Sequence, residues 1–335
     1  MIGLQRGLVH GAKIAALGVS IPERILTNAE LAGTIDTSDE WISSRTGIRE
    51  RRICRPDQAT SDLAIEAAND LLASNGYHAD DIDLVISTSL VPDMVFPATA
   101  SVIAEAIGAR RAGAFDVQSG CTGFVYGLAV ATAFVSAGIY DTVLVTGAEA
   151  ISKALDWTDR STSVLFGDGA GAVLVRPSDN GSIFAFDLGN DGSGAPYLNM
   201  PAGGTRLPAS HETVDARQHF LRMNGREVYR FATRRVVESC QKTLDDAGLA
   251  PADVDLFVPH QANQRIIEKV AGLLGFSDKQ VFYNLDRFGN TSCASIPLCL
   301  HDAMEQGRLR SGDRLLIVGF GAGLTWGSCL TRWEL

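Results

Sequence analysis

Three residues of types that can carry out thioester chemistry follow apolar segments of this chain. They are Cys121, His260 and Asn290. A thiolate can attack a thioester carbonyl, and an imidazole and an amide can stabilise the negative charge that the reaction places on oxygen. Taken singly, each has an ordinary structural explanation, because free cysteines are usually small buried hydrophobes and histidine and asparagine are common at structural and turn positions. Whether the three residues form a catalytic site therefore depends on whether the fold brings them together.

The sequence around Cys121 is typical of a strand-to-helix corner. A short apolar segment, 114–117, leads through a Ser-Gly turn to Cys121, and an uncharged Gly/Ala-rich segment continues to about residue 137. We expect a buried helix with the sulfur at its amino-terminal end. Unpaired amides and the helix dipole at that end favour a thiolate.

A repeat relates the two parts of the chain. The segment Asp80–Thr88 is echoed by Ala252–His260 at an offset of 172 residues, the separation of Asp83 and Asp255. The same offset leads from Cys121 to Cys293, which also opens a Gly/Ala-type helix. A strand is predicted before it, at Val281–Leu285. A strand-and-helix unit that occurs twice indicates duplicated α/β halves.

Duplication predicts two domains and one shared site. The predicted halves are residues 1–180 and 181–335. Equivalent strand ends of duplicated halves face one another, so we expect His260, Asn290 and the loop Gly319–Gly323 to meet Cys121. Further predicted elements are strands 13–20, 142–147, 170–175 and 314–318 and helices 28–32, 37–47, 61–75, 99–107 and 227–247.

Composition limits the classes of function. The 335 residues are 46% hydrophobic and 20% charged, as in a globular protein with an ample core. A net charge of −10 argues against a general nucleic-acid binder, which needs a basic surface. The six cysteines form no CxxC pair and residues 1–11 lack the apolar segment of a secretory signal, so we expect reduced thiols in a cytoplasmic protein. The uncharged run 117–140 is expected to be a core helix and not a membrane span.

No bound metal or redox cofactor is predicted. Cys293, Cys299 and His301 are irregularly spaced within a predicted core helix, which does not suit a metal site. The Gly-rich stretches 167–171 and 319–323 lack the G-x-G-x-x-G spacing of a dinucleotide-binding turn.

Longer motifs around these residues resemble the β-ketoacyl-acyl-carrier-protein synthase III family of the thiolase superfamily. The motifs are Ser-Gly-Cys-Thr-Gly-Phe at Cys121, Val-Pro-His-Gln-Ala-Asn-Gln-Arg-Ile at His260, Gly-Asn-Thr-Ser at Asn290, Asp-Thr-Ser-Asp-Glu-Trp-Ile from Asp36, Phe-Gly-Asp-Gly-Ala-Gly-Ala from Phe166 and Leu-Thr-Trp-Gly from Leu324. The resemblance extends from about Lys13 to Trp333. It implies a five-layered αβαβα fold and a homodimer.

The resemblance also implies the reaction that initiates type II fatty-acid synthesis. Cys121 would be acylated by an acyl-CoA with a short starter group, and malonyl-acyl-carrier protein would then lose CO₂. His260 and Asn290 would stabilise the resulting enolate, which attacks the acyl group to give a 3-ketoacyl-carrier protein. The backbone amides of Cys121 and Ala322 would form the oxyanion hole.

Binding residues are implied in the same way. The implied coenzyme A contacts are Thr37, Trp41, Arg45, Arg160 and Asn263. The implied acyl pocket consists of Val164, Leu165, Phe320 and, reaching across the dimer, Phe96. Arg226, Arg230 and Arg265 are candidates for a basic surface that binds the acidic carrier protein, and an ordinary solvated face would explain them equally well. Spacing alone favours a core or interface role for Trp41.

The chain departs from the family pattern at three places. Gly321-Ala-Gly-Leu324 stands where many bacterial members have Gly-Gly-Gly-Phe, and Cys293 replaces the commoner alanine after Asn-Thr-Ser. Gly272-Leu273 stands where some members have a lysine pair for carrier docking. The last departure bears on the docking surface and not on the chemistry.

Three further interpretations use the same residues. A secondary-metabolite acyltransferase or a quinolone-type condensing enzyme of the same fold would differ only in its products. A papain-like cysteine hydrolase also has the order Cys, His, Asn, but this chain lacks the local Cys-Trp signature. A non-catalytic binding protein of the thiolase fold would not become acylated at Cys121.

Overall fold

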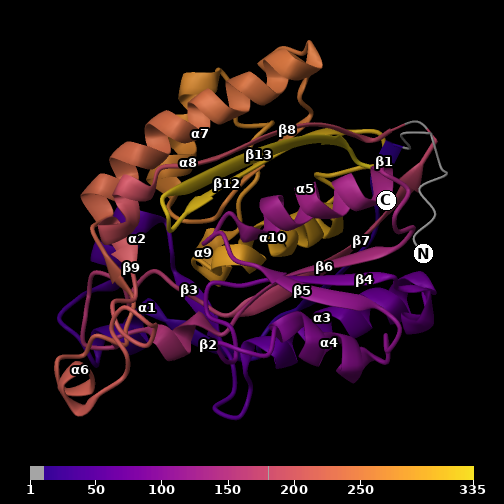
Figure 1. Cartoon of the computed structure of the whole chain (residues 1–335). Coiled ribbons are helices and arrows are strands. Elements are labelled where there is room, and N and C mark those ends of the chain that lie inside the picture. Colours follow the sequence, from indigo (N-terminus) through magenta and orange to yellow (C-terminus); the bar gives the residue numbers. More distant parts are fainter. Residues whose placement is uncertain (1–10, 180) are drawn as a thin grey trace.

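The computed structural model describes residues 11–179 and 181–335. The opening stretch 1–10, where no secretory signal is predicted, and the predicted boundary residue 180 lie outside the described residues. Figure 1 shows five layers, with outer helices above and below two sheets and a pair of helices between the sheets. The predicted αβαβα arrangement is confirmed.

The first sheet has five strands in the order β1-β7-β6-β4-β5. Its strands are β1 (Gly11–Ser20), β4 (Leu84–Thr88), β5 (Gly113–Val117), β6 (Val143–Glu149) and β7 (Gly169–Ser178). Strand β4 runs parallel to both β5 and β6, whereas β7 is antiparallel to β6 and to β1. Strands β4 and β6 are buried along their whole length, as expected for strands covered by helices on both faces.

The second sheet repeats this pattern with one strand fewer. Its order is β11-β12-β13-β8, with β11 and β12 parallel and the other pairs antiparallel. The strands are β8 (Ile183–Asn190), β11 (Leu256–Pro259), β12 (Arg314–Gly321) and β13 (Thr325–Arg332). The equivalence of β4 with β11, of β6 with β12 and of β1 with β8 supports the predicted duplication.

The predicted strand at Val281–Leu285 is wrong. Only Val281 forms a bridge, with Phe257 of β11, and Leu285–Phe288 is a helix, α9. The Asn284 carbonyl accepts from the Arg287 and Phe288 amides, and an aspartate follows in the first turn. These are helix-start features, and they end the extended segment early.

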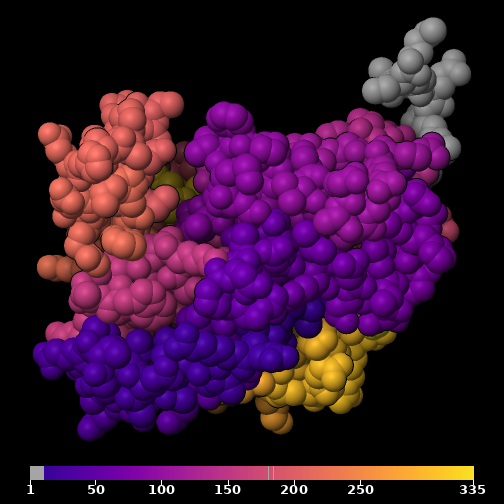
Figure 2. All heavy atoms as spheres, turned by 90° about the horizontal axis from the view of Figure 1, so that it is seen from below, coloured from indigo at the N-terminus to yellow at the C-terminus, as the bar shows by residue number. Residues whose placement is uncertain are grey.

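Three layers of helices cover and separate the two sheets. The central pair is α5 (Gly123–Ser136) and α10 (Ser295–Glu305). One outer layer is α3 (Thr60–Asn75) with α4 (Thr99–Ile107), and the other is α7 (Gly225–Ala247) with α8 (Gln264–Leu274). Helix α5 can lie close to the first sheet because Gly127 has no side chain. A Cβ at this position would come within 2.8 Å of Thr88. Figure 2 shows the face with α3 and α4, which is formed mostly by the first half of the chain.

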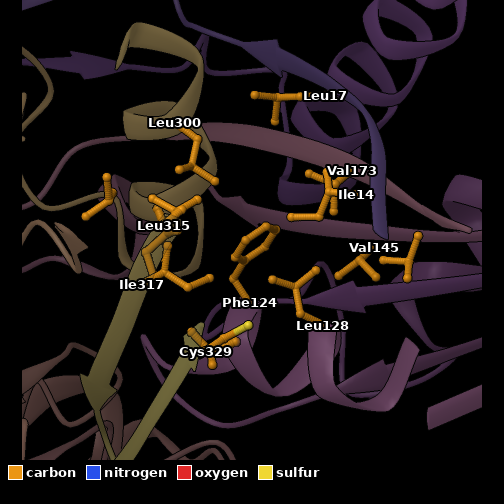
Figure 3. Close-up of a cluster of buried hydrophobic side chains, with 14 of the residues drawn as sticks. Ile14, Leu17, Phe124, Leu128, Val145, Val173, Leu300, Leu315, Ile317 and Cys329 are labelled. Carbon is orange, nitrogen blue, oxygen red and sulfur yellow. The ribbon is translucent and has the colours of Figure 1, made fainter. Parts of the chain in front are cut away.

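The main core lies around the central helices. Phe124 and Leu128 of α5 are fully buried between Ile317 of the second sheet and Val145 and Val173 of the first (Figure 3). Burial of large apolar side chains on both sides of α5 fixes the helix that begins beside Cys121.

Shorter elements surround the two sheets. They are β2 (Arg24–Thr27), β3 (Glu50–Ile53), β9 (Leu198–Asn199), β10 (Arg222–Met223), α1 (Asn28–Ala32), α2 (Asp39–Thr46), α6 (His211–Asp215) and five 3₁₀ turns at Ala79–Asp81, Ile151–Ala154, Gly192–Tyr197, Pro251–Asp253 and Ser292–Ala294. Within residues 11–179 and 181–335, no helix has the length and apolar character needed to cross a membrane.

Candidate active site

Cys121, His260 and Asn290 line one cavity of about 110 Å³. The three residues come from the ends of β5 and β11 and from the loop after α9. Phe320 and Gly321 of β12 complete that end of the cavity. The structure therefore brings together the three residues that the repeat predicted to meet, although the predicted strand before Asn290 is absent.

Cys121 lies two residues before α5, at the predicted helix end. Its side chain is almost fully buried, and burial raises the pKa of the thiol to about 12. The Ser292 hydroxyl acts in the opposite direction, and Glu149 adds to the increase. The thiolate expected from the helix dipole alone is thus outweighed by loss of solvation.

The loop after β12 packs directly against the Cys121 corner. A Cβ at Gly321 would lie 2.4 Å from the Cys121 amide nitrogen, and one at Gly120 would lie 2.6 Å from the Ala322 amide nitrogen. Only glycine allows this approach, and Gly120 also has a φ of +54°. Thr325 Oγ1 joins the two loops through contacts of 3.0 and 3.1 Å with the Ser119 and Ala322 carbonyls. The two loops that carry the amides predicted to form the oxyanion hole are therefore in direct contact.

His260 is buried at the end of β11, and its Nδ1 atom lies 2.6 Å from Ser295 Oγ, which also accepts from the Gln261 amide at 3.4 Å. The Ser295 hydroxyl can donate to Nδ1, and in that tautomer the ring proton resides on Nε2. Burial lowers the pKa of His260 to about 3, so the ring is neutral near pH 7 and can donate one hydrogen bond into the cavity.

Asn290 is held by its own loop. Its amide donates to the Leu165 carbonyl at 2.8 Å, and the Ser292 amide donates to its side-chain oxygen at 2.9 Å. Because a backbone N–H identifies this atom as Oδ1, the Nδ2 group is the side-chain donor. Like the histidine, Asn290 can offer a neutral donor in the cavity.

The predicted coenzyme A residues cluster around Trp41 of α2. The guanidinium carbons of Arg45 and Arg160 each lie 4.9 Å from the centre of the Trp41 ring. The Arg160 guanidinium also donates to the Asp36 carbonyl at 2.8 Å. A planar aromatic flanked by guanidinium groups suits a stacked base.

Asn263 connects this cluster to the cavity. Asn263 begins α8, accepts from the Arg265 amide at 2.9 Å and donates to the Arg45 carbonyl at 3.2 Å. It also lines the cavity with Cys121. Thr37 Oγ1 is buried and has no hydrogen-bond partner within the described residues. A buried hydroxyl without a partner is a candidate ligand contact.

The predicted acyl-pocket residues separate into two groups. Leu165 and Phe320 line the cavity with Cys121, whereas Val164 packs in a different apolar cluster with Ile42. Phe96 is 81% exposed in this chain. A second cavity of about 50 Å³ lies beside Ala322; its lining residues are Leu90, Val91, Ala154, Leu198, Asn199, Met200, Leu221 and Ala322.

The candidate carrier-binding arginines lie on exposed parts of α7 and α8. Arg230 is paired with Glu227 at 2.7 Å, and the Arg265 guanidinium donates to the Ser44 carbonyl at 2.7 Å. Arg226 is exposed near the start of α7. A groove of about 850 Å³ beside Arg230 contains both basic and acidic side chains, and Leu273 is 54% exposed at its edge.

Sequence reasoning missed several residues at the site. Leu198 and Met223 line the cavity from two short strands, and Ser292 and Glu149 both influence the pKa of the Cys121 thiol. The segment around Leu198 has no periodic pattern, and only its apolar side chains among Gly, Asn and Pro could have drawn attention to it. Among the described residues, no cluster of three or more His, Cys, Asp or Glu side chains is arranged to hold a metal ion.

Comparison with known proteins identifies the class first: this layered α/β architecture is a thiolase-like fold. Crystal structures of the same architecture include a β-ketoacyl-[acyl-carrier-protein] synthase III from Thermus thermophilus, with a TM-score of 0.89, 45% identity and coverage of 96% of this chain and 99% of that chain. The priming β-ketosynthase of the R1128 polyketide pathway has a TM-score of 0.92 and 35% identity, covering 99% of both chains.

The sequence comparisons define the family within that class. Residues 115–192 match the family described as 3-oxoacyl-[acyl-carrier-protein] synthase III, and residues 244–333 match its C-terminal part. The β-ketoacyl-[acyl-carrier-protein] synthase III of Natranaerobius thermophilus is 47% identical over 329 residues, covering 97% of this chain and 100% of that protein. The chain belongs to the β-ketoacyl-[acyl-carrier-protein] synthase III family.

Proposed function

We propose that this enzyme condenses an acyl-CoA with malonyl-acyl-carrier protein and so begins fatty-acid synthesis. Family membership supports the overall reaction. The observation that carries the residue assignment is the single buried cavity shared by Cys121, His260 and Asn290. A thiol nucleophile and two neutral donors in one apolar cavity suit acyl transfer followed by formation of an enolate.

In the first half-reaction, Cys121 Sγ attacks the thioester carbonyl of the acyl-CoA. The amides of Cys121 and Ala322 are proposed to bind the oxyanion, because their loops are in direct contact. Coenzyme A leaves and the acyl group stays on Cys121. Two adjacent backbone donors in a buried site stabilise this charge without reorganising during the reaction.

In the second half-reaction, malonyl-carrier protein loses CO₂ and its α-carbon attacks the acyl-Cys. His260 Nε2–H and Asn290 Nδ2–H are proposed to donate to the thioester oxygen on which the enolate charge develops. Neutral donors suit this role because a cationic imidazole would be costly in a buried site, as the low pKa of His260 reflects. The products are a 3-ketoacyl-carrier protein and CO₂.

The Trp41 cluster is the proposed site for the adenine of coenzyme A. Arg160 and Trp41 present flat recognition surfaces for a base. Asn263 joins Arg45 to the cavity, and the buried Thr37 hydroxyl is proposed as a further coenzyme A contact. The small cavity beside Ala322 supports a short starter acyl group.

A homodimer is proposed to complete the acyl pocket. Val95 and Phe96 are 85% and 81% exposed, and the neighbouring Met94 is also exposed. Strand β5 is one of the two edge strands of the first sheet. Exposed apolar side chains and an open sheet edge favour association with a second copy. In such a dimer Phe96 would enter the pocket of the partner.

The exposed arginines support a docking surface for the acidic carrier protein. Neighbouring acidic side chains reduce the positive charge of this surface. Arg265 lies next to Asn263 at the cavity mouth, which makes it the best placed of the three. Arg230 is partly neutralised by Glu227. We propose that Arg265 contributes most to carrier binding.

Intact-protein mass spectrometry tests this function. The enzyme and its Cys121→Ala variant are incubated with acetyl-, isobutyryl- and octanoyl-CoA, and malonyl-carrier protein is then added. We expect a Cys121-dependent acyl adduct, strongest with short acyl groups, followed by a ketoacyl-carrier product. Absence of an adduct with every acyl-CoA would refute the catalytic assignment.

The second candidate function is priming in a secondary-metabolite pathway. The structural similarity to the priming β-ketosynthase of the R1128 polyketide pathway favours this candidate over a cysteine hydrolase or a non-catalytic binding protein. The same assay separates an acyltransferase from a condensing enzyme, because acylation without condensation onto malonyl-carrier protein would indicate an acyltransferase.

A further inference from the structure

The loop that follows β4, residues 89–93, forms one wall of the small cavity beside Ala322. Leu90 and Val91 of this loop line the cavity, which has a volume of about 50 Å³. In the proposed mechanism, the carbonyl oxygen of an acyl group on Cys121 lies at the Cys121 and Ala322 amides, so the acyl chain extends beside this cavity. The position of loop 89–93 therefore limits the length of the acyl chain that the cavity holds.

Glu149 holds this loop from behind. It is the last residue of β6, is fully buried and lines neither of the two cavities at the site. Its Oε1 atom accepts from the Leu90 amide at 2.7 Å, and its Oε2 atom accepts from the Val91 amide at 3.1 Å and the Ser89 hydroxyl at 3.2 Å. Three consecutive residues thus donate to one carboxyl group. Because buried amides need an acceptor, this group fixes the backbone of the loop.

The register of the first sheet places Glu149 where the loop begins. Strands β4 and β6 are parallel, and Thr88, the last residue of β4, pairs with Gly147 of β6. Glu149 lies two residues further along β6, beside the point at which the chain leaves β4. The amides of the loop have no further strand residue to pair with there, and the carboxyl group of Glu149 takes their hydrogen bonds.

Two residues at the start of α3 hold the loop from its other end. The Thr60 hydroxyl donates to the Val91 carbonyl at 2.6 Å. Asp93 accepts from the Ser61 amide at 2.9 Å and from the Ser61 hydroxyl at 2.6 Å. Thr60 and Ser61 are buried. The wall formed by Leu90 and Val91 therefore cannot move without breaking hydrogen bonds to β6 or to α3.

A second part of the cavity wall begins directly after Glu149. The Ala150 amide donates to Thr60 Oγ1 at 3.1 Å, and the following 3₁₀ turn, Ile151–Ala154, places Ala154 in the cavity lining. Thr60 thus contacts the backbone on both sides: the Val91 carbonyl of the loop and the Ala150 amide before the turn. Glu149 and Thr60 together hold the loop that carries Leu90 and Val91 against the segment that carries Ala154.

We propose that Glu149 is a positioning residue that restricts the enzyme to short starter acyl groups by fixing Leu90 and Val91 against the acyl cavity. The role assigned to Glu149 rests on the proposed function, in which an acyl-CoA acylates Cys121. Glu149 acts only through the loop, since it does not line the cavity. In Glu149→Gln, an NH₂ donor replaces one of the two accepting oxygens, so at least one donor of the loop loses its acceptor and the wall moves. A wall that has moved makes room for a longer chain and contacts a short one less closely.

The test is a competition between acetyl-CoA and hexanoyl-CoA for Cys121. Both are present in excess in one mixture without malonyl-carrier protein, and intact mass gives the ratio of the two adducts. Because both adducts form on the same enzyme molecules, the ratio does not depend on the fraction of enzyme that is folded. An effect of Glu149 on the pKa of the Cys121 thiol changes both rates alike and cancels in the ratio.

The variants are Glu149→Gln and the isosteric Thr60→Val, and Asp83→Asn is the matched control. Asp83 precedes β4, and its carboxyl group accepts from the Asp141 and Thr142 amides at 3.0 and 2.9 Å before β6. It therefore joins the same two strands at their opposite end, away from the cavity.

We expect the wild type and Asp83→Asn to carry mostly acetyl groups, with adduct ratios within about twofold of each other. Apolar pockets discriminate by about tenfold or more for one methylene group. Glu149→Gln should therefore shift the ratio toward hexanoyl by about tenfold or more. Thr60→Val should shift it in the same direction and less, because the loop loses one hydrogen bond in that variant.

An unchanged ratio in Glu149→Gln would overturn the role of Glu149, even if acylation were slower, since a merely structural residue alters the amount of active enzyme and not its selectivity. An equal shift in Asp83→Asn would also overturn it. If Glu149→Gln does not fold, an unchanged ratio in Thr60→Val contradicts the proposal. Wild-type enzyme that prefers hexanoyl-CoA would refute the restriction to short groups alone, whereas wild-type enzyme that neither acyl-CoA acylates would refute the proposed function.

Discussion

The two halves carry different side chains at equivalent corners. Cys121 and Cys293 are 172 residues apart and precede the two central helices, yet only Cys121 lines the cavity. The Cys293 thiol instead donates to the Gly120 carbonyl at 3.0 Å. Thr88 and His260 form a second equivalent pair, in which Thr88 Oγ1 donates to the Thr146 carbonyl and His260 lines the cavity.

This difference shows how one fold, used twice, builds an asymmetric site. In the proposed mechanism, the first half supplies the nucleophile, and the second supplies the neutral donors. In each pair, the residue outside the cavity supports the backbone near Cys121. The Cys293 thiol donates to the carbonyl of Gly120, the residue before Cys121. Thr88 packs against Gly123 and Gly127 of α5. The proposed mechanism thus divides the chemistry between the halves, and Cys293 of the second half also stabilises the backbone beside Cys121 of the first.

Exchanging each corner cysteine for serine should give the largest contrast. Cys121→Ser should lose acyl-CoA condensation by 10³-fold or more, because a serine without a positioned base is a poor nucleophile. Cys293→Ser should keep activity within about threefold, since a hydroxyl can still donate to the Gly120 carbonyl. Steady-state rates and intact mass after incubation with acyl-CoA measure both.

A loss of more than 100-fold in Cys293→Ser, with an unchanged melting temperature, would contradict the supporting role of Cys293. Alkylation with iodoacetamide before mass analysis gives an independent count of reactive thiols. In the native enzyme the Cys121 thiol should be modified and the Cys293 thiol should be protected.

Removing the donors of the second half should separate the two half-reactions. His260→Ala and Asn290→Ala should each reduce condensation by roughly 10²- to 10³-fold, the usual cost of removing one donor to a developing oxyanion. Acylation of Cys121 should persist in both variants, because the proposed oxyanion hole for that step uses backbone amides. Single-turnover acylation and product formation are measured separately. Equal losses in both steps would show that the halves do not divide the chemistry.

The sequence predicts the meeting of Cys121, His260 and Asn290 because strand ends are governed by local patterns and the repeat relates them. It could not predict the state of the thiol. A helix start can be read from local sequence, but the loss of solvation that raises the pKa of Cys121 to about 12 comes from residues distant in the chain.

Local patterns also explain the errors and omissions. The apolar residues from Val281 onward suggested a strand, but Asn284 starts a helix after a single bridge. The position of Ser292 could not be predicted, because it depends on a positive φ. A serine at this place in the sequence does not indicate that conformation. Leu198 reaches the cavity from a segment without periodicity. The domain boundary near residue 180 and the roles of the binding residues remain predictions.

The smallest predicted effect concerns stability, and it distinguishes His260 from its equivalent Thr88. Burial lowers the pKa of His260 to about 3, whereas an unfolded histidine titrates near 6.5. Between those values the unfolded chain binds a proton that the native protein does not bind. The free energy of unfolding should therefore fall as the pH is lowered from 6.5 toward 3, by up to about 1.4 kcal/mol per pH unit.

The comparison with His260→Gln isolates this contribution. Glu149 has a raised pKa and acts in the opposite direction, but it is present in both proteins and its effect cancels in the difference. Urea unfolding at pH 7, 6 and 5 should show wild type losing stability relative to His260→Gln as the pH falls. Thr88→Val, which removes no titratable group, should follow the wild-type curve in parallel. A constant difference between wild type and His260→Gln at all three pH values would mean that the imidazole has the same pKa in the folded and unfolded chain, and it would contradict the lowered pKa on which the neutral-donor assignment is based.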